Sequence, residues 1–462
     1  MRVLLVAYDN GSYVHLFPIG LGYIASVLRR CGCDVTIYNQ DLNHYPDGHL
    51  TDYLDRNKFD MLGVSVIGGY YQYRKLLSIS EAVNRSANRP FYVIGGHGPA
   101  PEPEYFLRKT GADALAIGEG EITAVKLVEA LSAGGDLAGV KGIAYRKGDD
   151  IFVNERQPLI ENIDEIEFPA WDMFPMEHYR LFRFPNISGA EFSMSVLSGR
   201  GCTFKCNFCY RMDEGFRPRS SEAIIEEMGR LVKDYRIGYF AFQDELLMSS
   251  VKRTEEICKA MIGSGMKVKW SCNGRLNYAR PEVLRLMKEA GCVFINYGIE
   301  SMDDQALKNM NKALTTKIII KGIEATLASG ISPGFNIIFG NIGENREILM
   351  KGVEFLLKYD DGSQMRTIRP VTPYPGSPLY YHAIEKGLLK DVEDFYENKH
   401  LNSDLVSVNF TAMSDDEFHK CLYEANTTLI KNYFNNRLKE NIENAEKLYF
   451  SRDASFRGFR QV

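Results

Sequence analysis

The stretch that decides the fold is Gly201-Cys202-Thr203-Phe204-Lys205-Cys206-Asn207-Phe208-Cys209, directly after an expected strand over Phe192–Leu197. Spacings of four and three residues let one compact loop direct three thiolates toward a single centre. Thiolates that close together select zinc or an iron–sulfur cluster. A structural zinc site needs a fourth ligand, and the sequence has no second Cys or His pair nearby. An iron–sulfur cluster with one open iron is therefore favoured over an incomplete zinc site or three unrelated thiols.

The composition is that of a globular chain. It has 462 residues, 45% of them hydrophobic and 25% charged, which suggests about three domains. A net charge of -5 argues against a nucleic-acid coat or a polybasic membrane anchor. We find no apolar run of about 18 residues, so no membrane span is expected. The segment Met1–Ala7 predicts a buried first strand and no signal peptide, so we expect a cytoplasmic protein.

Six further cysteines are scattered along the chain. Disulfides are disfavoured in a reducing compartment. We therefore expect all six to be buried as small hydrophobic side chains. They are Cys31, Cys33, Cys258, Cys272, Cys292 and Cys421.

The cysteine loop lies near the start of an alternating series of strands and helices over 191–380. Helices are expected at about 221–234, 251–264, 281–290, 316–329 and 345–358. The strands are expected at Phe192–Leu197, Tyr239–Phe242, Lys267–Ser271, Val293–Tyr297, Gly334–Phe339 and Met365–Thr372. Six such units predict a partial (βα)6 barrel with its chemistry on the loops after the strands.

An earlier alternating series occupies 1–135. Its strands are expected at Arg2–Ala7, Asp34–Tyr38, Met61–Val66, Phe91–Gly95 and Ala114–Ile117. Near-continuous apolar strands separated by helices predict a Rossmann-like parallel sheet. Such sheets bind ligands beyond the carboxyl ends of their strands, where this chain is rich in glycine.

Two other regions follow different patterns. Residues 136–190 are expected to hold a hairpin of Gly142–Arg146 with Ile151–Asn154 and then an extended linker over Phe168–Pro175. Residues 381–462 are expected to be mostly helical, especially 415–449. The predicted fold is therefore α/β, with a Rossmann-like domain, a partial barrel and a helical C-terminal segment.

The Cys-x-x-x-Cys-x-x-Cys spacing after a strand that opens a (βα) series resembles the radical S-adenosylmethionine (SAM) superfamily. The resemblance implies a 4Fe-4S cluster on Cys202, Cys206 and Cys209, with SAM chelated by the open iron. An electron from a donor such as flavodoxin or ferredoxin then cleaves SAM to a 5′-deoxyadenosyl radical.

Further strand-end loops match this family and imply SAM contacts. Phe208 is expected near the adenine, Asp244 and Glu245 near the SAM ammonium, and Arg275 at the SAM carboxylate. Glu300 and Ser301 are expected at the ribose or methionine polar groups. The backbone around Gly340 and Ile342 is expected to contact the adenine.

The first domain resembles the cobalamin-binding domain that precedes many radical SAM cores. The matching segments are Pro18–Tyr23, Val64–Gly68, Gly95–Gly96 with Pro103–Glu104, and Gly118–Glu121. No Asp-x-His-x-x-Gly motif is present to supply an axial histidine, so the lower face of cobalamin is expected to be unligated by His. The cobalamin contacts that the resemblance implies are Ser65, Gly68, Gly69, Tyr70, Tyr71, Gly95, Gly96, Gly118, Glu119 and Gly120. For Tyr70 and Tyr71, packing in an aromatic core is an equally good interpretation.

Together the resemblances imply a cobalamin-dependent radical SAM C-methyltransferase. In such enzymes the 5′-deoxyadenosyl radical abstracts a substrate hydrogen, and methylcobalamin donates a methyl group to the carbon radical. One alternative keeps both cofactors and performs a ring contraction, cyclisation or oxidation. An alternative of another class is an iron–sulfur electron-transfer or binding protein. The substrate is left open between a peptide or protein side chain and a small metabolite.

Overall fold

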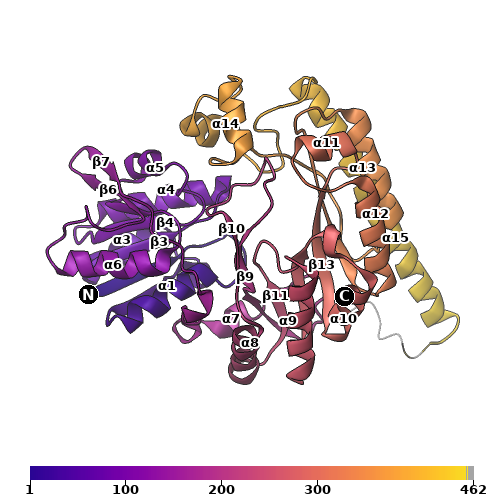
Figure 1. The fold of residues 1–462 in the computed structure, drawn as a ribbon, viewed down its shortest axis with the longest axis horizontal. Coiled ribbons are helices and arrows are strands. Elements are labelled where there is room, and N and C mark those ends of the chain that lie inside the picture. The colour runs from indigo at the N-terminus through magenta and orange to yellow at the C-terminus, as the bar shows by residue number, and fades with distance from the viewer. Residues whose placement is uncertain (454, 456–462) are drawn as a thin grey trace.

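The computed structural model describes residues 1–453 and 455. It forms two α/β units, the first indigo to purple and the second magenta to orange in Figure 1. The first unit holds a seven-stranded sheet of order β2-β1-β3-β4-β5-β6-β7. Its parallel strands are β1 Arg2–Ala7, β2 Asp34–Asn39, β3 Met61–Ser65, β4 Phe91–Gly95 and β5 Ala114–Ala116. All five begin at the predicted residue, so the parallel sheet is confirmed.

Helices connect these strands and cover the sheet, as the near-continuous apolar strands predict. They are α1 Ile19–Arg30, α2 Gln40–Asn43, α3 Gly48–Arg56, α4 Tyr70–Arg85, α5 Pro103–Thr110 and α6 Gly120–Ser132. The expected hairpin extends the sheet as β6 Ile143–Lys147 and β7 Asp150–Val153, which pair antiparallel.

The segment expected as an extended linker, Phe168–Pro175, contains one helical turn, η2 Trp171–Met173, so it is not extended throughout. Two further short helical elements flank it, η1 Ile163–Glu165 before it and α7 Met176–Tyr179 after it. The cause is aromatic burial, since the Phe174 ring packs against Phe17 of the first unit with centroids 5.0 Å apart. Side chains of this segment join a single hydrophobic core that includes residues of both sheets.

The second sheet has the order β15-β14-β13-β12-β11-β8. Every strand is parallel to its neighbours, and each one pairs with the next along the chain. The strands are β8 Phe192–Val196, β11 Ile237–Phe242, β12 Lys269–Gly274, β13 Cys292–Glu300, β14 Ser332–Phe339 and β15 Arg369–Pro370. This order confirms the partial barrel (Figure 1). The last strand is much shorter than the expected Met365–Thr372, although Val371 N just beyond it still donates to the Phe339 carbonyl at 2.8 Å.

Helices alternate with these strands close to the expected positions. They are α8 Ser221–Tyr235, α9 Val251–Gly263, η3 Leu276–Tyr278, α10 Pro281–Glu289, α11 Asp304–Asn309, α12 Thr316–Ala328 and α13 Arg346–Tyr359. Several begin at a side-chain cap, as Ser220 accepts from Ala223 N and Asn345 accepts from Ile348 N.

A two-stranded antiparallel ribbon of β9 Gly199–Cys202 and β10 Gly215–Pro218 was not predicted. Gly201 has φ +84°, and a Cβ there would overlap the carbonyl oxygen of Gly215. Figure 1 shows the ribbon between the two units. The cysteine loop connects its two strands.

The C-terminal segment contacts both units. It contains α14 Pro378–Glu385, the π-helix η4 Asp394–Lys399 and α15 Asp415–Tyr449. Around η4, the Tyr396 ring stacks on Tyr73 of the first unit with centroids 4.5 Å apart. Helix α15 packs along α13, on the outer side of the second unit (Figure 1).

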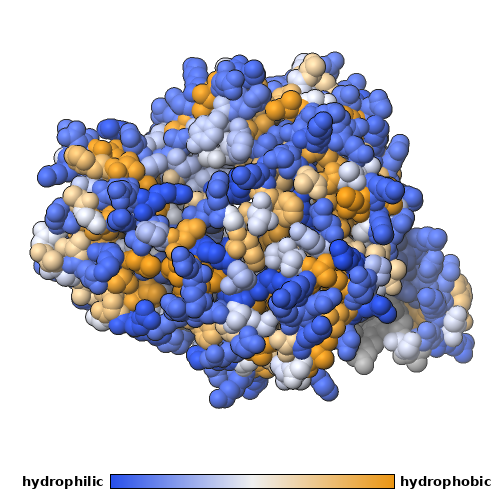
Figure 2. All heavy atoms as spheres, in the orientation of Figure 1, coloured by the Kyte–Doolittle hydropathy of each residue, from blue (hydrophilic) through white to orange (hydrophobic). Residues whose placement is uncertain are grey.

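Most of the molecular face in Figure 2 is hydrophilic, with hydrophobic residues in separate small areas. Within residues 1–453 and 455, no helix is long and apolar enough to cross a membrane. The expectation that all six scattered cysteines are buried was wrong for Cys31, which is exposed because it caps the C-terminal end of α1.

Candidate functional site

The cysteine loop is held at the carboxyl ends of the second sheet by its central residue, Asn207. The side-chain amides of Asn207 and Asn341, which follows β14, donate to each other at 3.1 and 3.0 Å. The Asn207 N–H donates to the Met310 carbonyl, and its own carbonyl accepts from Leu379 N. Four contacts on one residue fix the loop against three separate segments.

The three thiols lie in a positively charged environment. A hydrogen bond from Cys209, together with the nearby charges of Lys312 and Arg275, lowers the pKa of Cys206 to about 6. Burial raises the pKa of Cys202. Thiolates are the form that binds metals, and nearby cations favour them.

This donor set fits an iron–sulfur cluster better than a single ion. No three His, Cys, Asp or Glu side chains, among the residues that the structure describes, lie close enough together to hold one metal ion. In a four-iron cluster each thiolate binds a different iron, so the three sulfur atoms need not converge on one point. Cys202, Cys206 and Cys209 are the residues that would hold it.

A buried ion pair that sequence reasoning missed lies beside the cysteines. Lys312 Nζ donates to Glu300 Oε1 at 2.8 Å, and both side chains are less than 10% exposed. The same ammonium lies 5.6 Å from the centroid of the Phe208 ring. Burial lowers the pKa of Lys312, but Glu300 and the Cys206 thiolate raise it above its ordinary value. No motif in the sequence marks Lys312.

The two acidic residues after β11 have different environments. Asp244 is buried and accepts hydrogen bonds from Ser198 N at 2.9 Å and from Ser198 Oγ at 2.7 Å. Each of its two carboxylate oxygens therefore already has a partner within the protein. Burial raises its pKa to about 6. Glu245 is exposed, and within the described part of the chain it accepts a single hydrogen bond, from Gly201 N at 3.2 Å. Glu245 is therefore the acidic group that remains available at the cysteine loop.

Arg275 lies over the cysteine loop. Its guanidinium is 3.3 Å from the centroid of the Phe204 ring and donates to the Lys312 carbonyl. Burial lowers its pKa, and Cys206 raises it. The predicted Arg275 and Phe208 are thus brought together with the three cysteines.

The loop after β14 is closed by Glu344. Its Oε2 accepts from Gly340 N and Asn341 N, both at 2.9 Å. Burial raises the pKa of Glu344 to about 7. Ser301 is buried, and its hydroxyl counteracts part of this rise in pKa. Ile342 is partly buried. The backbone that was expected to contact adenine is therefore pre-shaped by an internal carboxylate.

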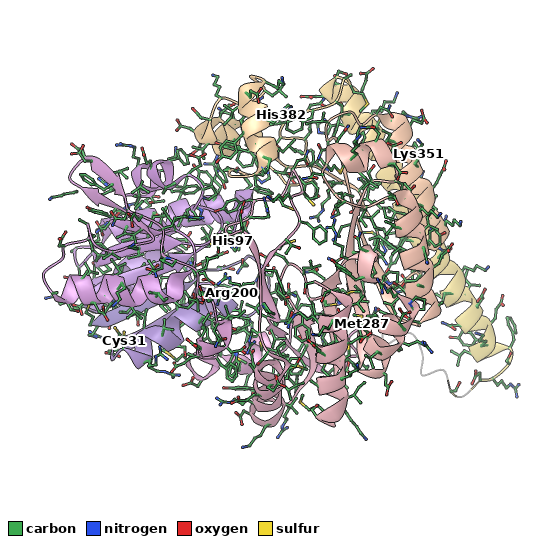
Figure 3. The ribbon with its side chains drawn as sticks, viewed as in Figure 1. Cys31, His97, Arg200, Met287, Lys351 and His382 are labelled. Carbon is green, nitrogen blue, oxygen red and sulfur yellow. The ribbon has the colours of Figure 1, made fainter. Side chains whose placement is uncertain are left out.

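The carboxyl edge of the first sheet is built differently. Gly96 has φ +96°, and a Cβ there would overlap the carbonyl oxygen of Val66, so this glycine lets two strand ends meet. Ser65 is exposed, and Ile67, which sequence reasoning missed, is 57% exposed. His97 is exposed too, and Figure 3 labels it between the two units.

The predicted tyrosines lie at the same edge, at the start of α4. Tyr71 is 44% exposed and donates to the Asp9 carbonyl at 3.0 Å, while Tyr70 lies against Arg74. Ile67 and Tyr71 expose apolar surface where β3 ends, which a broad flat ligand would cover. The other predicted glycines divide between buried Gly69 and Gly95 and partly buried Gly68, Gly118 and Gly120. These residues fit a corrin held over the strand ends.

Glu119 is placed differently from its neighbours. Its carboxylate accepts from Arg200 at 2.7 Å and from Arg217 at 2.9 Å, both on the ribbon that carries the cysteine loop. Burial raises its pKa, but hydrogen bonds from Arg217, Ile160 N and Arg200 hold it below its ordinary value. The side chain is turned toward the second unit and is not free to face a ligand.

Family comparisons match both units separately. Residues 196–356 match the radical SAM superfamily, and residues 11–128 match the B12 binding domain. The chain is a radical SAM enzyme with a B12 binding domain. The radical SAM match includes the cysteine loop, and the B12 match includes β2 to β5 of the first sheet.

This radical SAM enzyme has relatives of several kinds, which it matches over most of their length. It is 29% identical to an uncharacterized methyltransferase of Pyrococcus horikoshii, over 88% of this chain and 90% of that one. It is 27% identical to an anaerobic magnesium-protoporphyrin IX monomethyl ester cyclase of Rubrivivax gelatinosus, over 86% of this chain and 72% of that one. It is 26% identical to a cytidylyl-2-hydroxyethylphosphonate methyltransferase of Streptomyces wedmorensis, over 82% of this chain and 80% of that one.

Solved structures share the fold. The radical SAM methyltransferase TsrM from Kitasatospora setae, with cobalamin and a [4Fe-4S] cluster bound, superposes with a TM-score of 0.68 at 18% identity, over 83% of this chain and 75% of that one. The cobalamin-dependent S-adenosylmethionine radical enzyme OxsB, with aqua-cobalamin and SAM bound, superposes with a TM-score of 0.65 at 21% identity, over 84% of this chain and 55% of that one.

Proposed function

We propose that this enzyme is a cobalamin-dependent radical SAM C-methyltransferase. The observation that carries the proposal is the ribbon β9–β10, which holds the cysteine loop between the carboxyl edges of the two sheets. A substrate between these edges would lie within reach of both cofactors. The supporting relatives include two whose names contain methyltransferase.

The residues at the second edge would bind and orient SAM. When bound, the cluster supplies an electron for reductive SAM cleavage, and the corrin supplies the methyl group. Arg275 would donate to the SAM carboxylate, a charge-assisted contact. Glu245 would accept from the SAM ammonium, and Phe208 would pack against the adenine. The Lys312–Glu300 pair would keep the floor of this site rigid and shielded from water.

At the first edge, apolar and backbone contacts would hold the corrin. Ile67 and Tyr71 would provide apolar contacts to it, and the glycines would let it approach the backbone closely. Positioning and exclusion of water are the protein's share, since the cofactors supply the difficult chemistry. The proposal includes a cytoplasmic location and a flavodoxin-like or ferredoxin-like donor.

Label transfer tests the proposal. The reconstituted enzyme would be incubated without oxygen with a reductant, SAM carrying a deuterated methyl group, and a metabolite and peptide extract from cells that lack the gene. We expect one compound to gain an intact deuterated methyl group on a carbon atom. Transfer to sulfur or nitrogen alone would contradict C-methylation.

A non-methylating radical reaction is the second candidate, and the similarity to the magnesium-protoporphyrin cyclase favours it. It predicts that a compound in the extract is cyclised or oxidised and gains no label. The label experiment therefore separates the two candidates.

A further inference from the structure

The two glutamates of the turn Gly118-Glu119-Gly120-Glu121 form ion pairs between the two units. Arg200 Nη1 lies 2.7 Å from Glu119 Oε1, and Arg200 Nη2 lies 2.5 Å from Glu121 Oε1. Arg217 Nη1 lies 2.9 Å from Glu119 Oε2. Both glutamate side chains are 8% exposed, so these pairs are largely shielded from water. Figure 3 labels Arg200 near the junction of the units.

Two arginines of the ribbon lie side by side, so an anion between them is stabilising. Arg200 and Arg217 are directly opposite each other in the β9–β10 pairing. Like charges at opposed positions destabilise a strand pair. Glu119 resolves this repulsion, because one of its oxygens binds each arginine. The Tyr23 ring, 5.4 Å from the Arg200 guanidinium, covers the pair from α1.

The glycines of the turn are explained by packing and backbone geometry. A Cβ on Gly120 would lie 2.7 Å from Ile24 Cδ1, so glycine lets α6 approach α1. Gly118 has φ +92°, a conformation that favours glycine. The residue types of the turn are thus accounted for without a contact from either carboxylate to a ligand.

The same pairs connect the two cofactor regions. Arg200 lies two positions before Cys202 on β9, so a shift of Arg200 is passed directly to the cysteine loop. The turn follows β5 and includes the first two residues of α6, at the carboxyl edge of the first sheet. The ion pairs therefore join the edge that would hold the corrin to the strand that would hold the cluster.

We propose that Glu119 and Glu121 form an interdomain clamp with Arg200 and Arg217, which sets the position of the cluster loop relative to the cobalamin edge. In this assignment the two carboxylates position the ribbon and do not bind cobalamin, and Arg200 is a positioning residue. The effect on coupling rests on the proposed function, whereas the structural effect does not.

The test compares Glu119→Gln, Glu121→Gln and Arg200→Lys with the control Glu129→Gln. Glu129 lies on the same helix, α6, but its side chain is 57% exposed and pairs only with Lys126. Arg200→Lys keeps the charge but loses the two-pronged geometry. Amide hydrogen exchange of the reconstituted enzyme would be measured over 199–202, 215–218 and 118–124.

We expect faster exchange in these segments for the three clamp variants and wild-type exchange for the control. All four variants should retain hydroxocobalamin at the wild-type level. We also expect the ratio of 5′-deoxyadenosine to S-adenosylhomocysteine to rise by about tenfold or more in the clamp variants, because small displacements of reacting groups are costly. Unchanged exchange with loss of bound cobalamin would overturn the clamp and make the carboxylates cobalamin contacts. If the wild-type enzyme forms no S-adenosylhomocysteine, methyl transfer fails, while the exchange result still decides the clamp.

Discussion

The carboxyl edges of the two sheets solve different binding problems. At the second sheet the site is made of charged side chains, with Arg275 and the Lys312–Glu300 pair around three thiols. At the first sheet it is made of glycines and of exposed apolar side chains such as Ile67 and Tyr71. Charge at fixed points suits a small zwitterion such as SAM, whereas close backbone approach suits a broad flat ring. Substitutions at the two edges should therefore fail in different ways.

The largest expected effect breaks the second edge outright. Cys206→Ala should remove a cluster ligand, so that iron per chain falls from ~4 to near zero and reductive SAM cleavage stops. Cobalamin retention should be unchanged, since the first edge is intact. Iron analysis and corrin absorbance of the same reconstituted sample check both points. Cys31→Ser, at an exposed thiol in the first unit, is the matched control. Equal iron in both variants would contradict the ligand assignment.

The next effect concerns the buried pair of the second edge. Lys312→Met leaves Glu300 buried without its partner, which should lower the free energy of unfolding by about 3–5 kcal/mol. The double variant Lys312→Met with Glu300→Gln should recover most of that loss. Urea unfolding measures both.

Lys351→Met provides the control for that series. Lys351 lies on α13 and pairs at the surface with Asp303 and Glu347 (Figure 3). Surface pairs contribute little, so unfolding should hardly change. A cost for Lys312→Met no greater than that for Lys351→Met would show that the buried pair does not support this edge.

A pH dependence should appear at the same edge. Burial raises the pKa of Glu344 from 4.5 to about 7. A raised carboxyl pKa means that the stabilisation is complete below pH 4.5 and is lost as pH rises through 7. Between pH 5 and 8, the free energy of unfolding should fall by about 2–3 kcal/mol more in the wild type than in Glu344→Gln, since one pKa unit is ~1.4 kcal/mol. Glu347→Gln, at an exposed position on α13, should follow the wild type. Parallel curves for all three proteins would contradict the assignment.

The smallest effect belongs to the first edge, where no single side chain dominates. Ile67→Ala should weaken hydroxocobalamin binding by about 1 kcal/mol, or roughly fivefold, because a half-exposed isoleucine gains only part of its burial energy from the ligand. Titration by corrin absorbance measures it. Ile262→Ala, 37% exposed on α9, should bind as the wild type does. Unchanged affinity for Ile67→Ala would mean that the corrin lies elsewhere.

The contrast between the edges also explains what could be predicted from sequence. The first residues of strands, such as Met61 and Phe91, were predicted correctly because a buried parallel strand is a local run of apolar residues. The three cysteines were found because their ligand function needs a local spacing. The ribbon β9–β10 was missed, since its pairing joins short segments rich in glycine. Lys312 has no local motif, because it lies in the loop between α11 and α12 while its partner, Glu300, lies at the end of β13.

The acidic turn at Glu119 shows the limit most clearly. Its pattern resembles a cobalamin-binding element, yet its carboxylate contacts Arg200 and Arg217, which are about 80 to 100 positions away. A contact of that range depends on how the two units are packed, which no local pattern encodes.

The stoichiometry of SAM-derived products tests the central claim most directly. In the proposed function, the cluster edge and the cobalamin edge act on one substrate in one turnover. With reconstituted enzyme, reductant and substrate, 5′-deoxyadenosine and S-adenosylhomocysteine should therefore form in equal amounts. Sustained 5′-deoxyadenosine formation with substrate consumed and no S-adenosylhomocysteine would contradict it.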